Sequence, residues 1–137
     1  MYILIIGCGK LGSYLAGLLS KEGKDVVVID KTEDSFKSLS EDFSGFTLSG
    51  DATEIDVLER AKIDKADVVI ATTEDDNINV MIAQIAKKIY NVPCVLARLF
   101  EPARENIYRE FGIETICPTI LSAAYFKEKI LGDGGTR

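Results

Sequence analysis

The sequence predicts an α/β protein with a Rossmann-like, doubly wound parallel sheet of six strands in the order 3-2-1-4-5-6. Short runs rich in Val and Ile alternate with segments of helical periodicity, which is typical of strands buried under helices on both faces. The first run leads into three glycines with the spacing Gly7-x-Gly9-x-x-Gly12. The second run ends on an acidic residue, Asp30, 18 positions after Gly12. Right-handed crossovers then favour a sheet that grows outward from the first strand.

The elements are expected in strict alternation along the chain. Short apolar runs predict strands over residues 2–6, 26–29, 46–48, 68–71, 94–96 and 115–117. Helical spacing predicts helices over residues 11–22, 33–43, 54–61, 77–90, 102–111 and 120–130. Residues 1–131 therefore make one predicted domain. The glycine-rich residues 132–137 are expected to be a flexible tail or the start of a linker.

Local signals mark several of the helix ends. Thr53 stands three positions before Asp56, the arrangement of a capping box, and predicts a helix start. The acidic residues 75 and 76 place negative charge and a capping group where the fourth helix should begin. Gly23 and Gly112 follow the first and fifth helices, where a left-handed residue ends a helix at low cost.

Composition excludes several classes of function. The 137 residues carry 16 Lys and Arg against 22 Asp and Glu, a net charge of −6 that does not favour nucleic acid or anionic lipid. No apolar run approaches the ~18 residues that would cross a bilayer, and Met1 leads directly into a predicted strand rather than a leader. The cysteines at positions 8, 94 and 117 are far apart in apolar segments. They are expected to be buried thiols in a reducing cytoplasm, not a disulfide or a zinc site.

The glycine motif predicts a phosphate site. Gly7 permits a tight turn out of the first strand, Gly9 lets the backbone approach a diphosphate, and Gly12 lets the helix pack close to the sheet. The diphosphate would lie on the N–H groups at the helix N-terminus. Asp30 would accept hydrogen bonds from ribose hydroxyls and would repel a 2′-phosphate, so NADP is disfavoured. Lys31 weakens this repulsion without reversing it.

Two other strand ends carry polar side chains with two interpretations each. Asp51 follows the third strand and either bonds an adenine edge or a ribose, or only forms the turn that leads to Thr53. Arg98 ends the apolar fifth strand, at the edge of the sheet where ligands bind, and could pair with phosphate. The alternative for Arg98 is a surface ion pair with Glu101 or Glu105.

The segment after the fourth strand lies at the point where the strand order reverses. Thr72 and Thr73 could reach phosphate or ribose there, and Asn77 or Asn79 could donate to either. The acidic residues 74–76 are interpreted as a helix N-terminal charge cluster rather than a metal site. No metal site is predicted.

Residues needed for catalysis are missing from the sequence. There is no histidine, no Ser or Cys with a base at motif spacing, and no Ser-x-x-x-Tyr-x-x-x-Lys arrangement. The last strand is followed by about a dozen helical residues and a six-residue tail, too few for a substrate domain. The sequence therefore favours a protein that binds its nucleotide without chemistry. The alternative is an NAD-dependent oxidoreductase, or the cofactor-binding half of one.

Four stretches carry a family resemblance. They are "ILIIGCGKLGSYLA", "VVVID", "GDAT" and "ADVVIATTEDDNIN", in this order. Over residues 1–130 the chain resembles the TrkA N-terminal or RCK (regulator of conductance of potassium) domain family. The resemblance implies a cytosolic, nucleotide-sensing regulatory subunit of a Trk or Ktr potassium uptake system. Such subunits bind NAD(H), ATP, ADP or AMP and gate an integral membrane partner by conformational change, at the inner face of the membrane.

The resemblance also implies roles for particular residues. The phosphate loop would include Lys10 and Leu11 between the glycines, and Ala52 would flank adenine with its two neighbours. The predicted site, with Lys31 and Asn77 added to the implied residues from their positions alone, comprises Gly7, Gly9, Lys10, Leu11, Gly12, Asp30, Lys31, Asp51, Ala52, Thr53, Thr72, Thr73, Asn77 and Arg98. Members of this family pair through their later helices and build rings. The apolar helix at 120–130 is therefore expected to contact a second subunit. The helix that begins at residue 77 is also apolar on more than one face, but burial in the core of its own domain could explain this. Many members carry a second ligand-binding domain beyond the part that matches this chain.

Overall fold

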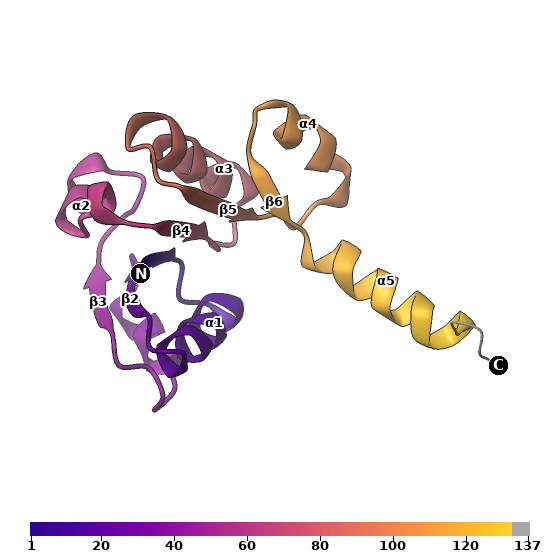
Figure 1. Ribbon diagram of the computed structural model, residues 1–137, viewed down its shortest axis with the longest axis horizontal. Coiled ribbons are helices and arrows are strands. Elements are labelled where there is room, and N and C mark those ends of the chain that lie inside the picture. The colour runs from indigo at the N-terminus through magenta and orange to yellow at the C-terminus, as the bar shows by residue number, and fades with distance from the viewer. Residues whose placement is uncertain (133–137) are drawn as a thin grey trace.

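A computed structural model of the chain describes residues 1–132, and these form one six-stranded parallel sheet with helices packed around it (Figure 1). The strand order is β3-β2-β1-β4-β5-β6, as the sequence predicts. The strands are β1 (Tyr2–Ile6), β2 (Asp25–Asp30), β3 (Phe46–Ser49), β4 (Val68–Ala71), β5 (Cys94–Arg98) and β6 (Glu114–Ile116). The α-helices are α1 (Lys10–Lys21), α2 (Ile55–Arg60), α3 (Asp76–Gln84), α4 (Glu105–Glu110) and α5 (Pro118–Leu131). Residues 1–132 also contain three short 3₁₀ helices, η1 (Glu33–Ser38), η2 (Ile63–Lys65) and η4 (Pro102–Arg104), and the π-helical turn η3 (Ile85–Ile89).

Alternate residues of β1 divide the core between the two faces of the sheet. Ile3 and Ile5 pack in a cluster that includes Ala16 of α1. Leu4 and Ile6 point the other way, into a cluster with buried residues of α2 and α3. All four of these β1 side chains are at most 2% exposed. This double burial explains why the strand reads as a continuous apolar run. A third cluster, around Leu99 and Tyr108, lies beside β5 and β6, at that end of the sheet.

Three predicted helices differ from the observed ones. The helix expected at 33–43 is only the 3₁₀ segment η1, because none of its residues is buried and Leu39 is already extended. The helix expected at 77–90 begins at Asp76 and changes to π geometry, where the Tyr90 N–H donates to the Ile85 carbonyl, before Asn91 ends it with a φ of 52°. The helix expected at 102–111 divides into η4 and α4. The 3₁₀ helix η2 was not predicted.

The capping predictions have different outcomes. Asp75 caps α3, since its carboxylate accepts the N–H groups of residues 77 and 78 at 2.8 and 3.1 Å. Gly23 and Gly112 adopt left-handed φ values of 78° and 77°, as expected. The capping box at Thr53 was wrong: the N-cap of α2 is Glu54, and the Thr53 hydroxyl is used by Asp51 instead. β6 begins and ends one residue earlier than predicted, because Cys117 is the N-cap of α5.

The cysteines are free thiols in two environments. Cys8 and Cys117 are buried, as expected. Cys94 is exposed, contrary to the prediction: it is the first residue of β5, a strand that becomes fully buried only at Ala97. Burial, together with the charge of Asp30, raises the pKa of the Cys8 thiol to about 11. Cys8 is therefore a packing residue at neutral pH.

Helix α5 extends away from the rest of the molecule (Figure 1). None of its residues is buried, and its exposed side chains include Leu121, Tyr125, Phe126 and Ile130, each at least 60% exposed. Gly132 ends this helix, and the remainder of the expected tail, residues 133–137, lies outside the described residues. No helix in the described part of the chain combines the length and the apolar character needed to cross a membrane.

Candidate functional site

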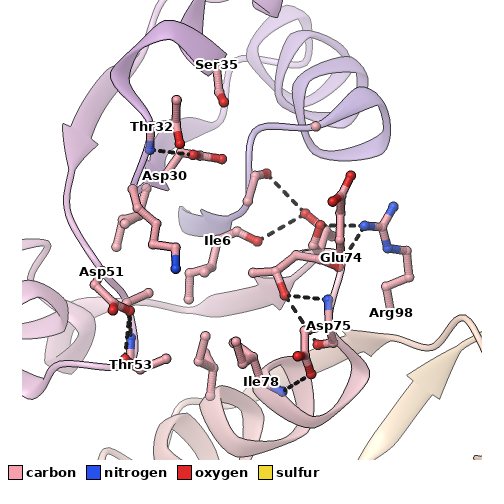
Figure 2. A pocket seen from close by; sticks show the side chains of 18 of the residues that line it. Ile6, Asp30, Thr32, Ser35, Asp51, Thr53, Glu74, Asp75, Ile78 and Arg98 are labelled. Carbon is pink, nitrogen blue, oxygen red and sulfur yellow. Dashed lines mark hydrogen bonds between the residues drawn. The ribbon is translucent and has the colours of Figure 1, made fainter.

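A cavity of about 600 Å³ runs along the carboxyl ends of β1 to β5 (Figure 2). This is the edge where open α/β sheets bind ligands. The cavity is lined by eleven of the predicted residues: Gly7, Gly9, Lys10, Asp30, Lys31, Asp51, Ala52, Thr53, Thr72, Thr73 and Arg98. Leu11, Gly12 and Asn77 do not line it.

The three glycines have three separate roles. Gly7 has a φ of 106°, and a Cβ there would lie 2.8 Å from the backbone carbonyl of Thr72. At Gly12 a Cβ would lie 2.0 Å from the Gly7 carbonyl oxygen, so this residue lets α1 approach the glycine loop rather than the sheet itself. A Cβ at Gly9 would meet no atom within 4 Å, because the residue faces the open cavity. The free space above Gly9 is the space that the motif reserves for a diphosphate.

The N-terminus of α1 opens onto the same space. The N-cap residue is Gly9, which has no side chain to cap the helix, and the first turn contains no acidic residue. The first N–H groups of a helix lack partners within the helix and carry the positive end of its dipole. Lys10 adds a full positive charge at this point of the cavity. Together these groups favour an anion.

Asp30 contacts the glycine loop as well as the cavity. One carboxylate oxygen accepts the Cys8 N–H at 2.8 Å, and the other accepts the Thr32 N–H at 2.8 Å. The sequence did not reveal the bond to Cys8. Each oxygen has a second lone pair, so a half-buried Asp30 can still accept a ribose hydroxyl. This side chain therefore couples the loop to the ribose position.

Asp51 forms the turn that the sequence offered as one of two interpretations. Its carboxylate accepts the hydroxyl of Thr53 at 2.7 Å and the N–H of the same residue at 2.9 Å. These hydrogen bonds, the hydroxyl first, lower the pKa of Asp51 below its usual value, and Lys31 adds to the effect. Asp51 also lines the cavity beside Ala52, so the turn does not exclude contact with a ligand.

The threonines after β4 use their hydroxyls within the protein. Thr72 is buried, and its hydroxyl lies 3.1 Å from both the Ile6 and the Gly7 carbonyl oxygens. The Thr73 hydroxyl donates to the side-chain oxygen of Asn79 at 2.6 Å. Both residues line the cavity, but in this structure their hydroxyls hold the loops rather than facing the phosphate position.

Asn79 is fully buried and joins two loops of the site. Its oxygen also accepts the Thr73 N–H at 2.8 Å, and its amide donates to the carbonyls of Thr73 and Arg98, each at 3.0 Å. It therefore positions the site from inside and is not a ligand donor. Asn77 lies outside the main cavity, where its side chain accepts the Tyr108 hydroxyl at 2.9 Å.

The Arg98 guanidinium reaches across to the loop after β4. One terminal nitrogen donates to the carbonyls of Thr72 and Thr73 at 2.8 and 2.7 Å, and the group stacks 4.4 Å from the centre of the Phe100 ring. Burial lowers the pKa of Arg98, while the nearby charges of Glu74 and Asp76 oppose this change. Its Nε is buried without a hydrogen-bond partner among residues 1–132.

The alternative ion pair of Arg98 is not formed. Glu105 pairs instead with Arg109 at 3.4 Å, and Glu101 accepts the Ala103 N–H at 3.2 Å. Arg98 instead lines the cavity, at the edge of the sheet where its interpretation as a phosphate-pairing residue requires it to lie.

Several lining residues were not predicted. Apolar side chains at the ends of β1 and β2 and on α3 cover one side of the cavity, and Thr32, Ser35, Glu74, Asp75 and Phe100 add polar and aromatic groups. Phe100 follows the end of β5 by two residues, and this position near the carboxyl end of a strand could have indicated that it lines the cavity. Among residues 1–132, no group of three or more His, Cys, Asp or Glu side chains could hold a metal ion.

Comparison with known proteins identifies relatives of similar sequence. A Trk system potassium uptake protein TrkA of Streptomyces coelicolor is 34% identical over 134 residues, which are 98% of this chain and 60% of the relative. A TrkA homolog of Methanothermobacter thermautotrophicus is 31% identical over 96% of the chain and 60% of its own length. The chain thus spans about three fifths of the curated relatives that it matches.

Solved structures with the same fold have lower sequence identity. The TrkA-N domain of the Escherichia coli inner membrane protein ybaL superposes with a TM-score of 0.81 at 20% identity, covering 93% of this chain and 94% of that one. A Shewanella denitrificans Kef C-terminal domain in its AMP-bound form gives 0.79 at 23% identity, over 98% and 84%. The GsuK channel bound to NAD gives 0.79 at 24% identity, over 93% and 22%. These likenesses establish the fold.

The family follows from the sequence itself. The TrkA-N domain model matches residues 3–119, which include β1 from its second residue onward, β2 to β6, the glycine loop and every predicted site residue. The chain therefore belongs to the TrkA-N domain family.

Proposed function

We propose that this chain binds an adenine nucleotide in the cavity at the carboxyl ends of the strands. The observation that carries the proposal is the open space above Gly9, between the N-terminus of α1 and the carboxylate of Asp30. The diphosphate would lie on the helix N-terminus, a ribose on Asp30, and adenine beside Asp51, Ala52 and Thr53. The AMP and NAD complexes of proteins with this fold support the same choice of ligand class.

The bound nucleotide would act as a signal. The relatives are potassium uptake proteins, which supports a regulatory subunit that controls an integral membrane potassium transporter from the cytoplasm. A nucleotide can shift such an assembly only by the difference in its affinity for two conformations. The alternative, an NAD-dependent oxidoreductase, requires a positioned proton donor, and the sequence contains no histidine. Turnover of NADH with a small carbonyl substrate would favour that alternative.

Replacing Asp30 with Ala is expected to weaken nucleotide binding by about 1–3 kcal/mol, the cost of losing a hydrogen bond to a charged group. The loss includes the freed Cys8 N–H, which the carboxylate holds at 2.8 Å. Titration calorimetry with NADH and with AMP measures the effect. Asp34→Ala is the matched control, because Asp34 is an exposed carboxylate on η1 that forms an ion pair with Lys37 and lies outside the cavity. Equal affinity of Asp30→Ala and the parent protein would remove Asp30 from the site.

We also propose that α5 contacts a second copy of the chain, as part of a dimer that builds a ring. A helix that is exposed on all sides and carries Leu121, Phe126 and Ile130 is not stable in isolation, so a partner that covers it is favoured. Phe126→Asp should shift the protein toward monomer in sedimentation experiments at micromolar concentration. Lys127→Asp, on the same helix, is the control that introduces the same side chain without removing an apolar one. A parent protein that sediments as a monomer would contradict the proposed contact.

A further inference from the structure

The cavity extends beyond the length that a mononucleotide requires. Its lining continues past the point where the strand order reverses, from Asp51 after β3 to Phe100 after β5. Five neighbouring strand ends, separated by four intervals of about 4.8 Å, span roughly 19 Å. In doubly wound folds the first half of this edge holds one mononucleotide and the second half holds the other. The ends of β4 and β5 therefore form a second half-site.

The two half-sites differ in their charge. At the first half-site the two cations balance the two carboxylates, and the positive end of the α1 dipole adds to them. The cations are Lys10, the first residue of α1, and Lys31, which follows β2; the carboxylates are Asp30 and Asp51. At the second half-site the only cation in the described lining is Arg98, and it is accompanied by the carboxylates of Glu74 and Asp75. Asp75 is committed to the cap of α3, where it accepts two backbone N–H groups. Glu74 is exposed, and its carboxylate accepts no hydrogen bond from residues 1–132.

Arg98 is only partly available to an anion. One of its terminal nitrogens is already bonded to the carbonyls of residues 72 and 73, and Glu74 lies close enough for its charge to act on the guanidinium. Figure 2 shows the Glu74 and Arg98 side chains on the same wall of the cavity. A chain of phosphates that passed from α1 into this half-site would bring additional negative charge toward Glu74, with one partly occupied cation to balance it.

We infer that Glu74 is a specificity-determining residue of the site, which disfavours nucleoside triphosphates and favours adenine dinucleotides with a single diphosphate. The inference rests on the proposed nucleotide binding and goes beyond it in the ligand that it selects. In a dinucleotide both phosphates stay at α1, and the second half of the ligand enters the β4–β5 half-site as a ribose and an uncharged or cationic ring. The Phe100 ring, 46% exposed and stacked on Arg98, provides an aromatic surface for that second ring.

Calorimetric titration of the parent protein and Glu74→Gln with NADH, AMP and ATP, in low salt with EDTA, tests the inference. The parent protein is expected to bind NADH more tightly than ATP, because like charges at the second half-site penalise the triphosphate. Glu74→Gln is expected to raise the affinity for ATP by about tenfold and to change that for AMP by less than about twofold, since one carboxylate charge is removed where only the longer phosphate chain reaches. Glu110→Gln, the same charge change on α4 outside the cavity, should change no affinity.

A second variant tests the placement of the dinucleotide. Phe100→Ala should weaken NADH binding several-fold and leave AMP binding unchanged, because AMP occupies only the first half-site. If both ligands bind Phe100→Ala and the parent protein equally, the second half of the ligand does not lie against Phe100, and this part of the inference is wrong.

Other outcomes separate the inference from the proposed function. If ATP binds the parent protein as tightly as NADH, or if Glu74→Gln leaves ATP affinity unchanged, the inference fails while nucleotide binding stands. If none of the three ligands binds the parent protein, the proposed function fails as well. The titrations are repeated with Mg²⁺ in place of EDTA. Tight Mg²⁺-dependent ATP binding that Glu74→Gln weakens would assign the carboxylate to a metal and overturn the inference.

Discussion

Gly12→Ala should lower the free energy of unfolding by about 3 kcal/mol and abolish nucleotide binding at the same time. The added Cβ would lie 2.0 Å from the Gly7 carbonyl oxygen and 2.8 Å from the Thr72 hydroxyl. Because the first of these atoms belongs to the backbone, either α1 or the glycine loop must move. The N–H groups at the helix N-terminus then lose their position relative to Asp30. Urea unfolding followed by circular dichroism, together with NADH titration, measures both effects.

Gly9→Ala is the matched control for this variant. The same methyl group is added three residues earlier, at a φ of −83° and with no atom within 4 Å. The unfolding free energy should fall by no more than about 1 kcal/mol, since Gly is a better N-cap residue than Ala by about this amount. Nucleotide affinity should nevertheless fall by about tenfold or more, because the methyl group enters the space left for the diphosphate. Normal binding by Gly9→Ala would place the ligand elsewhere.

Asn79→Ala should cost about 3 kcal/mol of unfolding free energy, through loss of the hydrogen bonds that join the loops after β4 and β5. Asn79 is 0% exposed, so the N–H of Thr73 and the carbonyl of Arg98 that it satisfies would be left without this partner in the interior. The loop that carries Thr72 and Thr73 should also lose its fixed position under the cavity. Equilibrium unfolding in urea gives the energy, and amide exchange of Thr73 reports on the loop.

Asn77→Ala separates this effect from a general effect of removing an amide in α3. The Asn77 side chain accepts a hydrogen bond from the Tyr108 hydroxyl, and the residue itself is exposed. Its loss should cost no more than about 1 kcal/mol. If Asn79→Ala is no more damaging than Asn77→Ala, the buried network does not hold the loops in place.

The fold was predictable because its determinants are local in the sequence. Each strand is a short Val- and Ile-rich run buried on both faces, and the glycine motif with Asp30 indicates the first half of a Rossmann-like sheet. The strand order, 3-2-1-4-5-6, is confirmed. The order also predicted which strand ends would line the cavity, since the carboxyl ends of parallel strands meet along one edge.

The roles of side chains within the site were harder to predict, because their partners are distant in the sequence. The Thr72 hydroxyl contacts the carbonyls of Ile6 and Gly7, more than 60 residues earlier. Asp30 binds the N–H of Cys8, 22 residues away. When these distant partners are unknown, a threonine or aspartate beside a predicted ligand site is readily interpreted as a residue that contacts the ligand. The role of Thr53 was also mispredicted, although its partner is close in sequence. Its hydroxyl donates to the carboxylate of Asp51 instead of capping α2.

The two edges of the sheet determine how this protein can associate with others. β3 and β6, with four and three residues, are no longer than any interior strand, so each edge leaves few backbone groups open for pairing with a foreign strand. Strand addition, the route that leads from exposed edges to fibrils, is therefore restricted. Apolar side chains remain available on α5. Contacts made through α5 would be formed by interdigitating side chains, which depend on shape and sequence and can be specific for one partner.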